Sequence, residues 1–497
     1  MSVANPRKLD LGPEDLGTVL GDWTAGNGPL HRLLATRLRE LADRGQLVAG
    51  ARLPPERALA EVLDVSRTTV VAAYQVLKAE GRLAARQGSG TYLLPGGAPS
   101  RADDPVIGAL ARNQLFAALG EAPAGLLDLA TAIPPAASCV AGALPDADDV
   151  AALCTETGYL PAGSDQLRAA LAEAYSASGL ATSAAEILVT TGAQQALSLV
   201  ASLYLRRGDP VVVDHPTYPG ALDVFRAAGA RLLTMPVDGG GARIDVLERL
   251  VRRTAPHLVY LVATHQNPVG SVLTGARRER LAAVAARSQV PVVDDTALAD
   301  LAHGPAGGHH EGQPPPVAAF APGAPVITVG SMSKLFWGGL RVGWIRAAEP
   351  VVARLRRLKT VADLGSPLLE QAWAARLLAQ VEEARAERHP QLHRRCRLLE
   401  DALTEALPSW RWTSPAGGVS LWVQVPGDAR ALAASALRHG VRVVPGSQFC
   451  ADEGCGDHLR LPFTQHPEVL VEGVRRLARA WRDQAQEAGS EADSVVV

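Results

Sequence analysis

A lysine between small hydroxyl residues is the centre of the chemistry that this chain can perform. Lys334 stands in VITVGSMSKLFWGGLRVGW, after Ser331 and Ser333 and seven residues before Arg341. A lysine amine can form a Schiff base with an aldehyde, and hydroxyl and guanidinium groups can bind a phosphate. Lys334 is therefore the candidate catalytic residue.

Two motifs earlier in the chain can hold the rest of a phosphorylated ring. ILVTTGAQQAL predicts a strand, a turn at Gly192 and the start of a helix, where the N–H groups of Ala193 and Gln194 can bind a phosphate. VVVDHPTYPG ends a predicted strand and places Tyr218 where its ring can stack on a flat heterocycle.

Two further motifs offer an amide and carboxylates. In HQNPVG, Asn267 precedes a proline, which keeps it out of helical geometry and lets its amide meet a ligand oxygen. VVDDTALADL places Asp294 and Asp295 at a strand end, and either can face a ring nitrogen. An amine for the aldehyde, a carboxylate for the pyridine nitrogen and groups for the phosphate together predict pyridoxal 5′-phosphate (PLP) as the cofactor.

The elements that must position these residues alternate along the chain. From about residue 126 to 481, short β-rich runs are separated by helical stretches rich in Ala, Leu and Arg, which predicts an α/β fold with a mostly parallel sheet covered by helices. Functional groups of such a sheet converge at the carboxyl ends of its strands. The strand candidates are EILVT, PVVVD, HLVYLVA, PVVDD and PVITVG.

A separate basic segment precedes this body. Residues 23–95 carry ten Lys or Arg against six Asp or Glu, although the whole chain of 497 residues has a net charge of -2. A basic front end on an acidic body suits a head that binds phosphates.

A recognition helix is predicted inside this segment. Ser66 can cap it, Arg67, Thr68 and Thr69 would form an exposed first turn, and the inner face would bury apolar residues. GRLAARQGSGTYL predicts a β-hairpin with its tip at 87–90. The predicted inner face comprises Val70, Ala73, Tyr74 and Leu77.

The head resembles the GntR family of winged helix-turn-helix regulators. The family pattern LP-x-x-R, VSR-x-T-V, a tyrosine and G-x-GT is present almost intact. The resemblance implies binding to a double-stranded DNA operator. The DNA-contacting residues that it implies are Arg52, Arg57, Ser66, Arg67, Thr68, Thr69 and Gly88.

The body resembles fold-type-I aminotransferases, which have a smaller C-terminal α/β subdomain, and the two parts together resemble the MocR subfamily. This resemblance makes Lys334 the lysine that forms the aldimine, Asp295 the partner of the pyridine nitrogen and Arg460 the group that holds an effector carboxylate. Asn267 would meet the ring 3-hydroxyl, and Tyr218 would stack on the ring. The phosphate would be held by Gly192, Ala193, Gln194, Ser331, Ser333 and Arg341, with Tyr159 reaching it from the neighbouring subunit of a homodimer.

One position departs from the family pattern. Aligning DDTALADL with D-x-x-Y-x-DL favours Asp295 by its spacing to Asp300 and puts Leu298 where a tyrosine usually reaches the 3-hydroxyl. Leucine has no hydroxyl, so we expect this contact to be absent and the catalytic tuning of the cofactor to be weakened.

The sequence also predicts the boundaries and the setting of the protein. Five cysteines form no even framework, so we expect reduced thiols, and Cys450, Cys455 and His458 lack the spacing and the fourth ligand of a zinc ribbon. We expect no metal, no membrane span and a cytoplasmic protein. The predicted parts are an irregular N-terminal extension 1–22, a winged helix-turn-helix 23–95, a linker 96–125, the PLP-binding body 126–482 and a flexible tail 483–497.

Three functions are open at this stage. The leading one is a PLP-dependent transcription regulator that senses PLP itself or an amino-acid-like amine through an aldimine at Lys334. The second is an active aminotransferase with an accessory DNA-binding domain, and as a regulator the body can still retain a transaminase half-reaction. The third, a PLP-storage or scaffold protein, gives no reason for an arginine-rich recognition helix.

Overall fold

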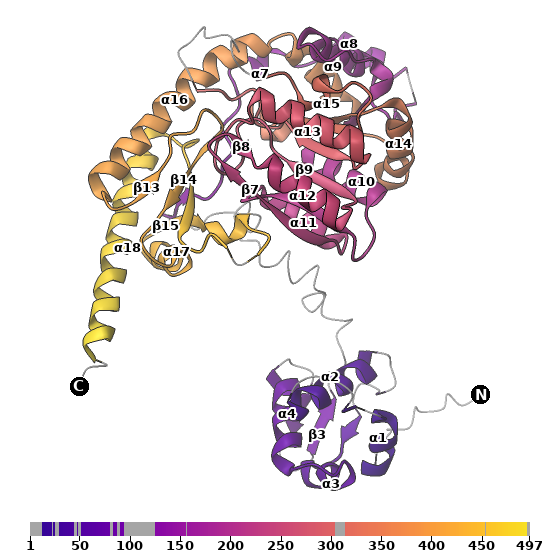
Figure 1. Cartoon of the computed structure of the whole chain (residues 1–497), viewed down its shortest axis with the longest axis vertical. Helices are drawn as coiled ribbons and strands as arrows, with labels where there is room; N and C mark the ends of the chain where they lie inside the picture. The colour runs from indigo at the N-terminus through magenta and orange to yellow at the C-terminus, as the bar shows by residue number, and fades with distance from the viewer. Residues whose placement is uncertain are drawn as a thin grey trace. The chain divides into compact units, whose positions relative to one another are not determined.

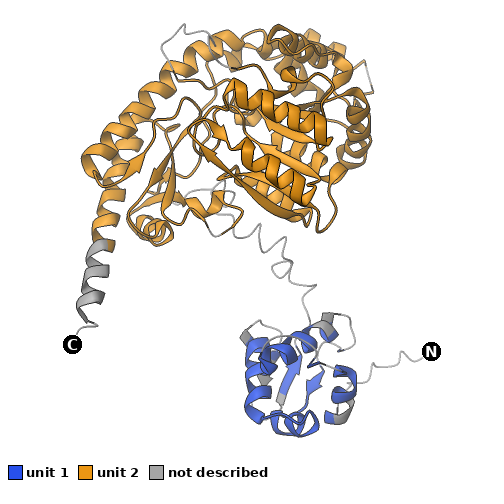
Figure 2. Cartoon of the chain, viewed as in Figure 1, with its two compact units in different colours: residues 1–108 blue, residues 109–497 orange. Residues whose placement is uncertain are grey.

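The computed structural model describes residues 12–21, 23–24, 29–43, 47, 51–79, 83–86, 90–93, 125–155, 157–303, 314–452 and 454–494. The chain divides into two compact units, Met1–Gly108 and Ala109–Val497, drawn in different colours in Figure 2. Nearly all of the predicted linker and the hairpin tip with Gly88 lie outside the described residues. Each unit is described by itself.

The first unit is a helical core closed by a small antiparallel sheet of strand order β1-β3-β2. The helix predicted after Ser66 is confirmed as α4, and its four predicted inner residues are all buried. Tyr74 of α4 also donates its hydroxyl hydrogen to the Pro54 carbonyl at 3.0 Å. The elements are α1 Pro13–Leu20, α2 Leu30–Asp43, β1 Arg52–Leu53, α3 Glu56–Val62, α4 Arg67–Ala79, β2 Leu83–Arg86 and β3 Gly90–Leu93.

The expectation of an irregular N-terminal extension is wrong for Pro13–Leu20. These residues form α1, and Leu16 and Leu20 are fully buried in the core of the first unit, with Trp23 beside them. A helix of two turns has little stability alone, so its formation depends on this packing, which local composition does not reveal.

The second unit contains an eight-stranded sheet of order β5-β12-β11-β10-β9-β6-β7-β8. The five predicted strands are confirmed as β5, β6, β9, β10 and β11, and the pairs from β11 through β7 are parallel. The strands are β5 Ile187–Thr190, β6 Pro210–His215, β7 Arg231–Asp238, β8 Gly241–Ala242, β9 Leu258–Leu261, β10 Val292–Asp295, β11 Val326–Ser331 and β12 Gly343–Arg346.

Helices cover both faces of this sheet, as Figure 1 shows around β7, β8 and β9. Val211 and Val213 pack with α10, α11 and α14, whereas the intervening Val212 packs with α12 and α13 on the opposite face. This alternation explains the continuous apolar runs of the strands. The helices of this region are α7 Cys139–Gly142, α8 Ala147–Leu153, α9 Asp165–Ala177, α10 Ala193–Tyr204, α11 Pro219–Ala227, α12 Ile244–Thr254, α13 Gly275–Ser288, α14 Glu349–Asp363 and α15 Leu368–Leu378.

The predicted smaller subdomain is built on a second sheet of order β13-β14-β16-β15-β4. Strand β4 comes from the start of the body and pairs in parallel with β15. The long helices α16 and α18 pack against each other beside this sheet (Figure 1). The elements are β4 Leu127–Leu129, α16 Val381–Ala406, β13 Arg411–Trp412, β14 Ser420–Gln424, α17 Ala429–Arg438, β15 Val441–Pro445, β16 His458–Pro462 and α18 Pro467–Ser494.

Helix α18 runs through residue 483, where the flexible tail was predicted to begin, as far as Ser494. One further expectation about the C-terminal region is wrong. Cys450 and Cys455, expected as reduced thiols, form a disulfide, while Cys139, Cys154 and Cys396 are free. Among the described residues, no helix is long and apolar enough to cross a membrane.

Candidate cofactor site and DNA-reading helix

The strand ends that carry the predicted cofactor residues meet at one edge of the large sheet. Strands β6, β9, β10 and β11 run in the same direction. Strand β5 also runs this way, because β12 is antiparallel to both β11 and β5. The segments after these five strands therefore converge, as the carboxyl ends of parallel strands do in open α/β sheets.

Lys334 follows β11 and is partly buried at this edge. Its Nζ donates a hydrogen bond to the Ala132 carbonyl at 2.9 Å. Burial lowers the pKa of Lys334 to about 8, the guanidinium groups of Arg460 and Arg341 act in the same direction, and the Asp295 carboxylate opposes them. About a tenth of this amine is therefore unprotonated at pH 7, and the unprotonated form is the one that attacks a carbonyl.

The two adjacent carboxylates lie on opposite faces of the sheet. Asp295 Oδ2 accepts a hydrogen bond from the Tyr260 hydroxyl at 2.9 Å, and the Lys334 charge acts on Asp295. Asp294 instead accepts from the Val317 amide at 3.4 Å and is influenced by Arg278. The geometry thus favours Asp295 as the group that meets a ring nitrogen.

Tyr260, in the middle of β9, is a neighbour of Asp295 that the sequence analysis missed. It is fully buried, and its ring contacts Phe225 edge to face. Burial raises the pKa of the Asp295 carboxyl to about 6, while the Ala297 amide and the Tyr260 hydroxyl lower it. Tyr260 holds Asp295 by a hydrogen bond that depends on the pairing of β9 with β10, which local sequence does not specify.

The phosphate end of the site is the start of α10. Gly192 precedes this helix with a φ of +104°, and no side chain caps the helix. A Cβ at Gly192 would lie 2.7 Å from Arg341 Nη2, so glycine lets the guanidinium approach the first turn. Ser331 and Ser333 add two hydroxyls 3.1 Å apart. Unpaired N–H groups, a guanidinium and two hydroxyls suit a phosphate.

Tyr218 and Gln194 are joined at the same edge. Tyr218 donates its hydroxyl hydrogen to Gln194 Oε1 at 3.2 Å, and Gln194 Nε2 donates to the Gly220 carbonyl at 3.0 Å. Burial raises the pKa of Tyr218, so its hydroxyl stays protonated. Asn267 follows β9 and is partly exposed, and its side chain has no hydrogen bond with the described residues. Its amide is therefore available to a ligand.

Arg460, in β16, brings a buried cation to the site from the second sheet. It is 2% exposed, its guanidinium carbon lies 5.1 Å from the centre of the Phe449 ring, and Nη2 donates to the Ala130 carbonyl. Its Nε has no hydrogen-bond partner among the described residues. Burial lowers the pKa of Arg460 to about 10. A buried guanidinium with an unpaired donor suits an anionic group such as a carboxylate.

Leu298 and Tyr159 stand apart from this polar cluster. Leu298 is buried among apolar side chains, and its carbonyl lies 2.8 Å from His265 Nδ1, so no hydroxyl is supplied at this position. Tyr159 is 68% exposed. A single chain thus leaves Tyr159 largely uncovered.

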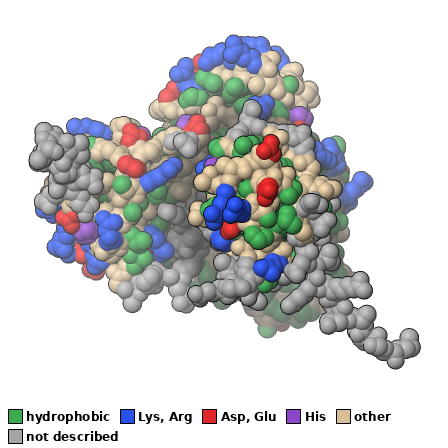
Figure 3. Space-filling view, turned by 90° about the horizontal axis from the view of Figure 1, so that it is seen from below, with side chains coloured by type: hydrophobic (Ala, Val, Ile, Leu, Met, Phe, Trp, Pro, Cys, Tyr) green, Lys and Arg blue, Asp and Glu red, His purple; other side chains and the backbone are tan. Residues whose placement is uncertain are grey.

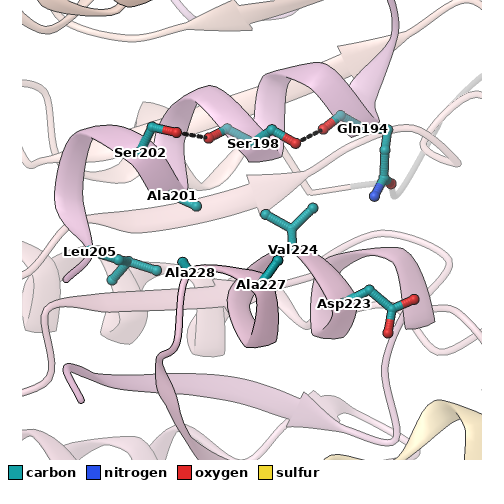
Figure 4. Close-up of a pocket in the computed structure, with 9 residues that line it drawn as sticks. All are labelled: Gln194, Ser198, Ala201, Ser202, Leu205, Asp223, Val224, Ala227 and Ala228. Carbon is teal, nitrogen blue, oxygen red and sulfur yellow. Dashed lines mark hydrogen bonds between the residues drawn. The ribbon is translucent and has the colours of Figure 1, made fainter. Parts of the chain in front are cut away.

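A shallow groove of about 660 Å³ lies between α10 and α11 (Figure 4). It shares Gln194 with the predicted phosphate site, and Asp223 is the charged residue of its lining. Lys334, Asp295 and Arg460 do not line it. The groove is therefore distinct from the polar cluster.

The candidate DNA contacts lie at the start of α4. The Ser66 hydroxyl accepts from the Thr69 amide at 3.2 Å and lies 2.7 Å from the Thr68 hydroxyl, which confirms the predicted cap. Arg67 and Thr68 are exposed, and so are Arg52 and Arg57 on neighbouring elements. Lys and Arg side chains gather in several groups on the face drawn in Figure 3. Exposed arginines beside a capped helix start can reach the groove and phosphates of DNA.

Comparisons with known proteins agree with this arrangement. Residues 126–477 match the family of class I and II aminotransferases, and residues 31–93 match the gntR family of bacterial regulatory proteins. The chain is 36% identical to 2-aminoadipate transaminase of Thermus thermophilus over 59% of this chain and 75% of that protein. It is 28% identical to the HTH-type transcriptional regulator TauR of Rhodobacter capsulatus over 92% of this chain and 97% of that protein.

Other relatives cover the body or both units. The chain is 28% identical to MocR of Rhizobium meliloti, a probable rhizopine catabolism regulatory protein, over 71% of this chain and 72% of that protein. The crystal structure of LysN, an α-aminoadipate aminotransferase from Thermus thermophilus complexed with N-(5′-phosphopyridoxyl)-L-leucine, matches with a TM-score of 0.65 and 33% identity over 76% of this chain and 97% of that chain.

The residues of this chain fit the cofactor of that fold. The Lys334 amine, the Asp295 carboxylate and the uncapped start of α10 offer partners for an aldehyde, a ring nitrogen and a phosphate. Class I and II aminotransferases depend on PLP. The chain therefore belongs to the class I and II aminotransferase family, with PLP as its cofactor, and its gntR-family head makes it a member of the MocR subfamily of regulators.

Proposed function

We propose that this protein is a DNA-binding transcription regulator that senses PLP or an amino-acid-like amine at Lys334. The observation that carries the proposal is the Lys334 amine, held near Asp295 with a pKa lowered to about 8, in a chain that also has a capped helix with an exposed Arg67. The match to TauR along 92% of the chain supports a regulator with both units. A regulator that binds DNA acts in the cytoplasm, where we place it.

Each group of the site has a defined task in this proposal. PLP, when bound, supplies an aldehyde that reacts with an amine. Lys334 would offer that amine, Asp295 would stabilise a protonated ring nitrogen, and Tyr260 holds the Asp295 carboxylate in place. Tyr218 covers the ring. The phosphate would be held by Gly192, Ala193, Gln194, Ser331, Ser333 and Arg341, and Asn267 would offer its amide to the ring 3-hydroxyl.

Arg460 suggests the chemical class of an effector. Its buried guanidinium has an unpaired Nε, so a carboxylate would satisfy a donor that is otherwise costly to bury. A molecule with both a carboxylate and an amino group would place the first on Arg460 and the second in competition with Lys334 for the aldehyde. If PLP itself is the effector, Arg460 has no effector carboxylate to bind.

A homodimer would complete the site. Tyr159 is 68% exposed, and the adjoining Leu160 backbone lies against Gly365, which follows the exposed Leu364. We propose that a second subunit covers this apolar surface and receives Tyr159 at its phosphate site. Light scattering should show a dimer, and a PLP-saturated monomer would contradict this assignment.

An active aminotransferase with an accessory DNA-binding head is the alternative. The identity of 36% to 2-aminoadipate transaminase and the retained Lys334, Asp295 and Arg460 favour it. Leu298, which supplies no hydroxyl, argues against efficient turnover.

Two parallel assays separate these functions. Purified protein is mixed with fragmented genomic DNA and the bound fragments are sequenced, while turnover of amino-acid and keto-acid pairs is measured on the same preparation. The proposal predicts enrichment of discrete sites and little turnover. Rapid turnover without enrichment of any site would make the protein an enzyme.

A further inference from the structure

A cluster of metal-binding side chains lies outside the cofactor site. Among the described residues, His215, Cys450 and Cys455 bring one imidazole nitrogen and two sulfur atoms within 4.8 Å of one another. Cys455 Sγ is 3.9 Å from His215 Nε2, and Asp452 Oδ1 is 3.8 Å from the same nitrogen. His458, the histidine considered in the sequence analysis, instead stacks on Trp422 and bonds to Asp457.

These four side chains provide the donor set of a zinc site, and the two sulfurs, which are bonded to each other in the disulfide, can take up zinc spacing only after reduction. Zinc is bound tetrahedrally by thiolates, imidazoles and carboxylates, with bonds of about 2.3 Å to sulfur and 2.0–2.1 Å to nitrogen. That geometry separates neighbouring ligand atoms by roughly 3.3–3.8 Å. The distances from His215 Nε2 to Cys455 and Asp452 are close to these values.

Hydrogen bonds to the backbone hold the segment that carries Cys450 next to the end of β6. Arg226 donates to the carbonyls of Cys450 and Ala451 at 3.2 and 3.1 Å, and the Thr217 amide donates to the Phe449 carbonyl at 2.8 Å. A Cβ on Gly454 would lie 3.1 Å from His215 Nε2, so glycine keeps the imidazole accessible.

The imidazole of His215 has no strong partner of its own. Its Nδ1 is buried without a hydrogen-bond partner among the described residues, and the nearest polar atoms to Nε2 are the sulfur and carboxylate described above. Nε2, which faces the sulfur and the carboxylate, is therefore the ring nitrogen placed to bind an ion, and Nδ1 would carry the ring proton.

We propose that the reduced pair Cys450 and Cys455 binds a Zn²⁺-like divalent ion together with His215 and Asp452. The disulfide first accepts two electrons and two protons from a dithiol reductant, which becomes a disulfide itself. The two thiols then release two protons as their sulfurs bond the ion. Formation of the disulfide therefore abolishes the site.

The bound ion would join the two sheets of the body. His215 ends β6 of the large sheet, whereas Cys450 and Cys455 lie between β15 and β16 of the second sheet. Phe449, next to Cys450, packs under the Arg460 guanidinium. A change in the redox state of Cys450 and Cys455 would therefore alter the surroundings of Phe449, the ring that contacts Arg460. The proposal does not depend on what the protein senses.

Zinc titration of the full-length protein tests the proposal. Samples are kept with the disulfide intact or reduced with a phosphine, which takes up the oxygen of water, and Zn²⁺ is then titrated against a chromophoric chelator. We expect one tight equivalent per reduced chain and none per oxidised chain. Cys455→Ser and His215→Asn should each weaken binding by at least about 100-fold. Cys154→Ser removes an exposed free thiol and should change nothing.

Cobalt substitution of the reduced wild type supplies a readout that does not depend on any variant folding. A site with two thiolates gives intense tetrahedral bands and sulfur-to-cobalt charge transfer. Absence of these bands, absence of tight zinc binding in the reduced wild type, or undiminished binding by the disulfide form or by folded Cys455→Ser would each overturn the proposal.

Discussion

The two units build their candidate sites in different ways. The head gathers Ser66, Arg67, Thr68 and Thr69 in consecutive positions of one helix start, where Arg67 and Thr68 are exposed to solvent. The body draws its groups from several strand ends far apart in sequence and buries Asp295 and Arg460 fully and Lys334 partly, so the pKa of Lys334 falls to about 8. In the exposed site of the head, one side chain can be substituted with little effect on its neighbours. In the body, substitution of one charged group changes the pKa of the others, as Arg460, Arg341 and Asp295 do for Lys334.

The largest expected effect is in the body, at Lys334. Lys334→Ala should abolish the covalent attachment of PLP completely, because no other amine occupies its position. Borohydride reduction followed by mass spectrometry of peptides should find the pyridoxyl group on Lys334 in the wild type and in the matched control Lys78→Ala. Labelling of another lysine in wild type would contradict the assignment.

The two neighbouring carboxylates should respond differently. Asp295→Asn removes a charged partner on the site face, and hydrogen bonds to charged groups contribute about 1.5–3 kcal/mol, so the Kd for PLP should rise roughly 10–150-fold. Asp294→Asn acts on the opposite face and should lower thermal stability more than PLP affinity. Equal effects of both substitutions on the Kd, measured by absorbance titration, would remove the distinction between the two faces.

A substitution in the head should affect DNA without affecting PLP. Arg67→Ala, if the side chain reads a base, should cost roughly 1–3 kcal/mol on the specific site and relax its specificity. Arg32→Ala changes an exposed arginine outside the recognition helix and serves as the control. Fluorescence anisotropy on specific and random duplexes measures both, and equal losses on the two duplexes would make Arg67 a phosphate contact.

The smallest effect concerns the pH dependence of cofactor uptake. Because the pKa of Lys334 is lowered to about 8, its reactive unprotonated fraction should rise about fivefold between pH 7 and pH 8 and less than twofold above pH 9. Stopped-flow absorbance on apoprotein follows the rate. A rate that keeps rising steeply to pH 10 would show an unperturbed lysine.

Hydrophobic patterns predicted the helices and strands whose apolar residues recur within one short stretch of sequence. The inner face of α4 and the five strands β5, β6, β9, β10 and β11 are found where the sequence places them. The residues that contact the site residues were harder to predict from the sequence. Tyr260 reaches Asp295 through the pairing of β9 with β10, and His215 meets Cys455 across 240 positions, so neither contact has a signature in a short stretch of sequence.

The central claim is that the body senses a ligand and passes the result to the head, and operator affinity tests it most directly. Operator DNA is titrated with wild type, Lys334→Ala and Arg460→Ala, each in the apo state, with PLP, and with PLP plus carboxylate-bearing amines. A coupling free energy of about 1–3 kcal/mol predicts a 5–150-fold change in wild-type affinity. Lys334→Ala should blunt every response, and Arg460→Ala should weaken the response to the amines alone. Identical operator affinity of the wild type in all three states would contradict the account.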